Sequence, residues 1–297
     1  MSTVVLLAVT GLGLGALYFL VASGLSLIYG VMRVLNFAHG AFLSVGGYLG
    51  YEAAMHTGAH SRSWPVFALA LLVGAVSGAV LALLVELLLI RRLYQREIEQ
   101  VLVTVGLGLA TVALVTGVWG ADARPFPSPA WMAQTTSVFG AAIPNLRFVC
   151  ILAAAAVLLG LRLLLDKTRY GLIIRAGVEN RSMVSALGID VRRTFTAVFT
   201  LGGALAGFGG VLTALYNSTV SPTMGDSLLI FAFIVVVIGG LGSVTGSAVA
   251  AAGVALLQQF ANYYTTSGVG DLTVVAALAV VLLVRPGGFI GRQVRLA

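Results

Sequence analysis

Long apolar runs, separated by short polar or glycine-containing segments, fill almost the whole chain. A helix needs about 20 mainly apolar residues to cross the hydrocarbon core of a bilayer. Two of the candidate runs, 228–240 and 272–284, are short for a crossing. The pattern therefore predicts an all-α, polytopic helical membrane protein with about eight or nine membrane segments, some of them broken by glycine. The candidate segments are 4–30, 37–54, 64–90, 101–120, 146–165, 194–216, 228–240, 246–261 and 272–284.

Composition supports the same class of protein. The chain is 59% hydrophobic and only 9% charged, with a mean hydropathy of +1.05, whereas charged residues make up about 25% of a soluble domain. The 37 glycines fit membrane helices that pack closely through small residues. The polar connections are too short to fold alone, so residues 1–297 are expected to form a single transmembrane domain in the lipid bilayer.

The net charge of +7 does not indicate a nucleic-acid partner, because the basic residues cluster in a few connections between apolar runs. Arginine and lysine are enriched in cytoplasmic loops of membrane proteins. This rule predicts that the connection at 91–96, the segment 166–193 and the tail from 285 onward are cytoplasmic. The connection 121–145 would then lie on the opposite side, with the N-terminus outside and the C-terminus inside.

Residues 166–193, which we call the coupling segment, are basic and lie between two apolar runs. Asn180 can cap a short helix and Gly188 can end it. Between them, apolar residues follow at helical spacing and give the helix an apolar side. Such a side either docks on a cytosolic partner or lies on the lipid headgroups. Its residues are Met183, Val184, Ala186 and Leu187.

Two apolar runs are interrupted in a similar way, the first within 27–41 and the second within 234–247. Each breaks at glycine and small polar residues and then resumes as a run of small residues. Corresponding breaks in two halves of a transporter indicate a substrate site, since unwound backbone is tolerated only where it lines a cavity. The alternative is that both are plain cytoplasmic turns, which Arg33 favours for the first.

We call residues 36–40 the first break and residues 239–243 the second break. In the first, the candidate pathway residues are Asn36, Phe37, His39 and Gly40. In the second, they are Gly239, Gly240 and Ser243. Asn36, Ser243 and freed backbone groups would give a passing solute transient polar partners. A single histidine near a helix start, such as His39, is more often a structural donor than a ligand.

Few other side chains are candidates for chemistry. Glu86 lies in an apolar run, and we expect it to pair with Arg91 rather than to relay protons. Cys150 is the single cysteine, so neither a disulfide nor a cysteine-based metal site is expected. The three histidines are scattered, which argues against a metal site and against a membrane enzyme.

Three passages together resemble the permease subunits of bacterial branched-chain amino-acid ABC importers. Near the N-terminus is GLSLIYGVMRVLNFAHGAFLSVGGYLG (24–50), with NFAHG (36–40) as its sharpest element. The coupling segment TRYGLIIRAGVENRSMVSALGIDVRR (168–193) is followed by LGGALAGFGGVL (201–212). Near the C-terminus are IGGLGSVTGSAVAAAGVALLQ (238–258) and VRPGGFIG (284–291). Permeases for urea and short amides, and those of the ribose type, are similar.

The resemblance implies a permease of the bacterial inner membrane that pairs with a second, homologous permease. It implies two cytosolic ATPase subunits, which bind ATP and Mg²⁺, and a periplasmic substrate-binding protein. This chain has no G-x-x-x-x-G-K-[ST] loop, so it is expected to hold no cofactor and to hydrolyse no ATP itself. The coupling helix would sit in a groove of one ATPase, through Glu179, Asn180, Met183, Val184, Ala186, Leu187 and Gly188.

The expected function is import of branched-chain or similar apolar amino acids. Urea or a short amide is the alternative substrate. An ion-coupled secondary transporter is a further alternative, although such a protein would require more acidic side chains inside the membrane than Glu86 alone.

Overall fold

A computed structural model describes residues 2–57, 63–94, 96–179, 190–266 and 268–289. Helices dominate these ranges. They are α1 (Ser2–Met32), α2 (His39–His56), α3 (Trp64–Leu88), the 3₁₀ turn η2 (Ile90–Arg92), α4 (Glu97–Trp119), α5 (Ala130–Ala133), α6 (Asn145–Lys167), α7 (Arg169–Glu179), α9 (Val191–Asn217), α10 (Met224–Gly239), α11 (Val244–Tyr264) and α12 (Val269–Val284). Four short strands complete the list: β1 (Arg124–Pro125), β2 (Thr135–Val138), β3 (Ala141–Pro144) and β4 (Thr219–Val220).

Six helices of the described ranges are long and apolar enough to cross a membrane: α1, α3 with η2, α4, α6, α9 and α11. The apolar helices α10 and α12 have only 16 residues each. The 18-residue α2 is less apolar, since it contains Glu52 and two histidines. The all-α membrane class is therefore confirmed, while the expected number of about eight or nine membrane segments is not.

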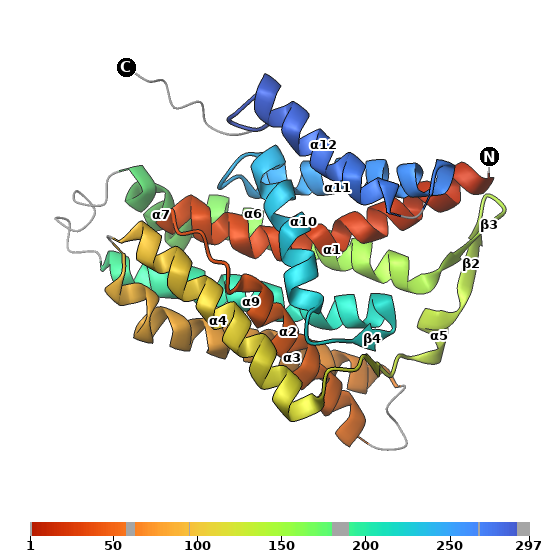
Figure 1. Ribbon diagram of the computed structural model, residues 1–297, viewed down its shortest axis with the longest axis horizontal. Helices are drawn as coiled ribbons and strands as arrows, with labels where there is room; N and C mark the ends of the chain where they lie inside the picture. The colour runs from red at the N-terminus through yellow and green to blue at the C-terminus, as the bar shows by residue number, and fades with distance from the viewer. Residues whose placement is uncertain (1, 58–62, 95, 180–189, 267, 290–297) are drawn as a thin grey trace.

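The long helices run lengthwise through the molecule, as α1, α9 and α11 show in Figure 1, and α10 crosses α1 steeply. The aromatic rings of Tyr18 in α1 and Phe231 in α10 stack at this crossing, with centroids 5.0 Å apart. Strands β2 and β3 lie at one end of the long axis and α7 lies at the other (Figure 1). The connection 121–145 and helix α7 of the coupling segment, predicted on opposite sides of the membrane, thus lie at opposite ends.

Two small antiparallel sheets form at the end that carries β2 and β3. These two strands pair with each other, with Thr135 opposite Pro144 and Val138 opposite Ala141. Strand β1 pairs with β4, which directly follows α9 in the chain. The pairing satisfies backbone groups that connections without helical structure leave free.

Helix α9 lies at the centre, packed against α1, α2 and α3. The contacts use glycines, because a side chain would keep the backbones apart. A Cβ atom added to Gly207 would overlap the carbonyl oxygen of Gly74, and one added to Gly203 would overlap the side chain of Ala82. On the α2 side, Gly46 abuts the Gly207 backbone in the same manner.

Candidate functional site

The first break is buried inside the protein rather than exposed as a loop. After α1 ends, Arg33 has a positive φ of 56° and is exposed. The chain then turns inward, and Asn36 and His39 are completely buried. Asn36 Oδ1 accepts a hydrogen bond from the Ala38 amide at 3.1 Å, and its carbonyl accepts one from the His39 amide at 3.3 Å. These bonds form the turn from which α2 begins.

His39 binds the first helix of the chain. Its Nε2 lies 3.1 Å from the carbonyl oxygen of Val21, so this nitrogen donates the hydrogen bond. Within the described ranges Nδ1 has no partner. Gly24 makes room for the ring, since a Cβ there would lie 2.9 Å from His39 Cε1. His39 therefore acts as a structural donor between α1 and α2 in this conformation.

The remaining residues of the first break contact α10. The ring of Phe37 lies against Phe233, with centroids 4.9 Å apart. Gly40 packs on the start of α10, where a Cβ would lie 2.8 Å from the carbonyl oxygen of Gly225. Ser44, one turn further along α2, accepts a hydrogen bond from the Gly225 amide at 3.1 Å. The start of α2 and the start of α10 are thus joined.

The second break is a tight turn between α10 and α11. Gly240 and Gly242 have φ angles of 99° and 83°, a region that residues with a Cβ rarely adopt. Ser243 caps α11, since its Oγ accepts a hydrogen bond from the Gly246 amide at 3.0 Å. Gly239 packs directly on the backbone of Gly246. The residue types that interrupt this run are therefore those that the turn requires.

The structure places the two breaks at opposite ends of α10. Gly40 meets its start at Gly225, whereas Gly239 is its last residue. A helix of 16 residues is about 24 Å long. The second break instead contacts the end of α1, since a Cβ on Gly30 would lie 2.9 Å from the Gly242 Cα. That both breaks line a translocation route stays a prediction.

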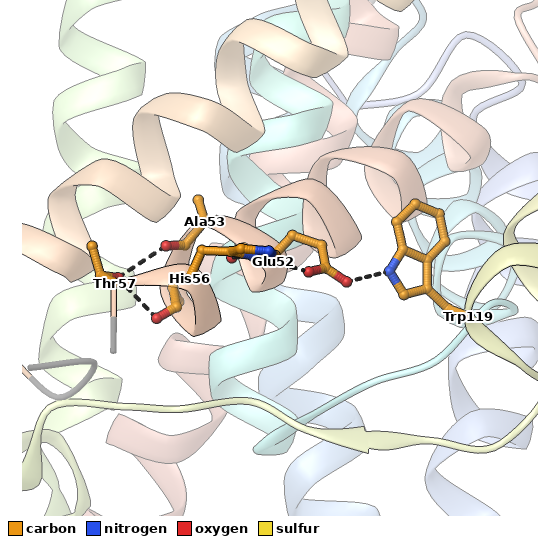
Figure 2. Close-up of polar contacts among 6 residues, drawn as sticks. Glu52, Ala53, His56, Thr57 and Trp119 are labelled. Atoms are coloured by element: carbon orange, nitrogen blue, oxygen red, sulfur yellow. Dashed lines mark hydrogen bonds and ion pairs between the residues drawn. The ribbon is translucent and has the colours of Figure 1, made fainter. Parts of the chain in front are cut away.

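The far end of α2 is fixed by a polar cluster with α4 (Figure 2). Glu52 accepts a hydrogen bond from the indole Nε1 of Trp119 at 2.5 Å. His56 Nδ1 lies 2.9 Å from the Glu52 carbonyl oxygen, and Thr57 donates to the Ala53 carbonyl at 3.0 Å. Helix α2 is therefore held at both ends, at His39 and at Glu52.

Glu86 has other partners than the one expected. It is completely buried, and its two carboxylate oxygens accept hydrogen bonds from the hydroxyls of Tyr94 and Thr196, the latter at 2.9 Å. Arg91 is exposed and forms no ion pair within the described ranges. Arg91 lies beyond the end of α3, in the turn η2, where the chain has left the α-helix that carries Glu86. Glu86 thus ties α3 to the first turns of α9.

The part of the coupling segment that the structure describes consists of its two flanks. Helix α7 forms the first flank and ends at Glu179, and it was not among the predicted helices. After it, Asp190 caps α9 by accepting hydrogen bonds from the amides of Arg192 and Arg193, at 3.0 and 3.3 Å. The predicted docking residues between these flanks lie outside the described residues: Asn180, Met183, Val184, Ala186, Leu187 and Gly188.

Within the described residues, six long apolar helices around a glycine-packed centre define a multi-pass helical membrane protein. The family model for the permease component of branched-chain amino acid transport systems matches residues 7–285, and the chain belongs to this family.

Its relatives cover most of the chain. The high-affinity branched-chain amino acid permease LivH of Salmonella typhimurium is 26% identical, over 95% of this chain and 94% of the relative. The probable branched-chain amino acid permease LivH of Methanocaldococcus jannaschii is 30% identical, over 93% and 89%. The fructose import permease FruF of Bifidobacterium longum is 29% identical, over 93% and 75%. No solved structure matches the chain.

Proposed function

We propose that the chain is the transmembrane permease subunit of an ATP-driven ABC importer, which moves branched-chain, apolar amino acids from the periplasm across the inner membrane into the cytoplasm. The observation that carries this proposal is the family match over residues 7–285. Both LivH relatives are named as branched-chain amino acid permeases. The likeness to a fructose permease supports the class of import permeases rather than one substrate. Urea or a short amide is the alternative substrate.

An ion-coupled secondary transporter is the weaker alternative. Such a protein uses acids inside the membrane that exchange protons or bind cations. Glu86 is completely buried, and each of its oxygens accepts a hydrogen bond from a hydroxyl group. A carboxylate engaged in this way serves packing between α3 and α9 better than ion exchange.

The test of this function is uptake by the complete importer. The chain would be reconstituted into liposomes with its second permease, two ATPase subunits and the substrate-binding protein. We expect labelled leucine to enter only with ATP and the binding protein. Uptake of urea, a short amide or fructose without leucine would contradict the proposed substrate. ATP-independent uptake by this chain alone would contradict the proposed class.

Docking of the ATPase is assigned to the coupling segment. Its residues are Glu179, Asn180, Met183, Val184, Ala186, Leu187 and Gly188. We expect Met183→Asp and Leu187→Asp to abolish co-purification of the ATPases, because a charge on the apolar side cannot be desolvated cheaply. Gly188→Val should act similarly, since a β-branched residue resists a left-handed helix cap.

A matched control for the docking test is Ala176→Asp, which adds the same charge at an exposed position of α7. We expect this variant to keep the ATPases. Unchanged co-purification with the Leu187→Asp and Met183→Asp variants would instead favour a helix that lies on lipid headgroups.

The translocation route is assigned to the two breaks and to α10 between them. Asn36 Nδ2 and His39 Nδ1 support this, because both are buried without a hydrogen-bond partner among the described residues and could bond a passing polar solute. Phe37 would add an apolar wall beside Phe233. Binding should be weak, since an importer must release its cargo. The proposed pathway residues are Asn36, Phe37, His39, Gly40, Gly239, Gly240 and Ser243.

Single cysteines test the route in a Cys150→Ala background. The variants Asn36→Cys, His39→Cys, Gly240→Cys and Ser243→Cys would be probed with a membrane-impermeant thiol reagent, with and without ATP turnover. We expect labelling to change with turnover, because a gated route opens to each side in turn. Constant, full labelling from the cytoplasmic side would mean that the breaks are ordinary turns.

A further inference from the structure

An open groove of about 820 Å³ lies between α3 and α9, away from both breaks. We call it the α3–α9 groove. It lies where the apolar span Trp64–Arg92 ends, with Arg91 at its rim. One wall is apolar and includes Leu83 and Leu87 of α3. The groove therefore spans the boundary between the hydrocarbon core and the polar membrane surface.

The polar end of the groove carries a net positive charge. Arg91, Arg193 and Asp190 line it. Asp190 lies 3.2 Å from Arg193 Nε, and its Oδ1 accepts the first amides of α9, so this carboxylate is engaged. Arg91 has no ion-pair partner in the described part of the chain and is exposed. One arginine is thus available in full, and a second in part, to an anion.

Deeper in the groove, Thr200 offers no polar contact to a ligand, although it lines the groove. Its hydroxyl oxygen is buried and has no hydrogen-bond partner among the described residues. The neighbouring Thr196 hydroxyl is engaged, because it donates to Glu86. Below Thr200, the lining continues with Leu201 and Ala204.

Along the groove, the cationic end is followed by a mainly apolar lining. We propose that the α3–α9 groove binds one anionic phospholipid. Its phosphate lies at Arg91 and Arg193, and an acyl chain lies along Leu87 and Leu83. Basic pockets between membrane helices on the cytoplasmic side suit anionic headgroups. Free phosphate would leave the apolar wall unused.

The experiment measures lipid retention by the purified chain, and it does not depend on the transport substrate. The permease would be prepared with equimolar phosphatidylglycerol and phosphatidylcholine, and bound lipid would be counted by native mass spectrometry. We expect preferential retention of phosphatidylglycerol. Arg91→Gln should weaken that retention about fivefold, the effect of one cation near a membrane surface. Arg193→Gln should act less strongly, since Asp190 already engages it.

One further variant separates the site from general electrostatics. Arg96→Gln is the matched control, because Arg96 lies in the same connection but pairs with Glu99 at 3.1 Å and does not line the groove. We expect it to retain phosphatidylglycerol like the unmodified chain.

Three results would overturn the proposal. Equal retention of the two lipids would mean that the arginines select nothing. An equal loss with Arg96→Gln would mean that only the surface potential matters. Protection of a Leu83→Cys probe by self-association, with no lipid bound, would mean that a second copy of the chain occupies the groove.

Discussion

Helices α9 and α6 are both long and apolar, yet they occupy opposite kinds of environment. The most apolar stretch of α9 is 72% buried inside the protein, whereas that of α6 is only 17% buried. The mean hydropathy runs the other way, at 1.7 for α9 and 2.6 for α6. The more hydrophobic helix is therefore the more exposed one. Since lipid tails are as apolar as leucine, hydrophobicity does not select the interior of a membrane protein.

Small residues, rather than hydrophobicity, determine which helix lies in the interior. In α9, Gly203 and Gly207 abut the backbones of Gly78 and Gly74 in α3. In α6, Gly160 has nothing within 4 Å of where its Cβ would lie. Close backbone approach gains dispersion contacts that lipid cannot supply. The helices at the centre are thus those whose glycines allow the backbones to approach closely.

The largest expected effect comes from Gly207→Val, with Gly160→Val as the matched control. Valine at Gly207 would overlap the Gly74 carbonyl, which belongs to another helix and cannot move aside. We expect a destabilisation of more than about 3 kcal/mol and loss of folded protein, measured by size exclusion and thermal unfolding in detergent. Gly160→Val should behave like the unmodified chain. Equal melting temperatures for the two variants would break the comparison.

The next largest effect concerns the contact between α3 and α9 that Glu86 makes. Glu86→Ala removes the acceptor of both the Tyr94 and the Thr196 hydroxyls from a fully buried position. We expect a loss of about 2–4 kcal/mol in the free energy of unfolding. The control is Glu99→Ala, whose exposed pair with Arg96 contributes about 0–1 kcal/mol. Indistinguishable unfolding curves for the two variants would contradict the structural role of Glu86.

The smallest expected effect comes from a leucine of α6 that faces lipid, compared with a buried leucine of α9. Leu152 in α6 is 69% exposed, whereas Leu212 in α9 is fully buried. We expect Leu152→Ala to change stability by about 0.5 kcal/mol or less, because lipid fills the space. Leu212→Ala should cost about 2–5 kcal/mol, because it leaves a cavity. A larger loss at Leu152 than at Leu212 would mean that another protein surface covers α6.

The sequence pattern predicted the features that depend on residues close together in the chain. Apolar runs gave the long helices, and glycines marked the turn at Gly240 and Gly242, where positive φ angles require them. Partners far apart in sequence were not predictable, since no periodicity links Glu86 to Thr196 or His39 to Val21. The pairing of Glu86 with Arg91 was wrong for that reason. Helix α7 was not predicted, because its basic, amphipathic stretch lacks the long apolar run that marks the other helices.

The glycines at the centre also have a consequence for how this chain can vary. Glycine is the smallest residue, so every substitution at Gly207 or Gly203 adds volume where neighbouring backbone leaves none. A leucine that faces lipid can be exchanged for many residues of different size. A saturation mutagenesis scan should therefore find the least tolerance at positions with no side chain at all. In this protein, the positions that natural selection must conserve most strictly are glycines, because no side chain fits there.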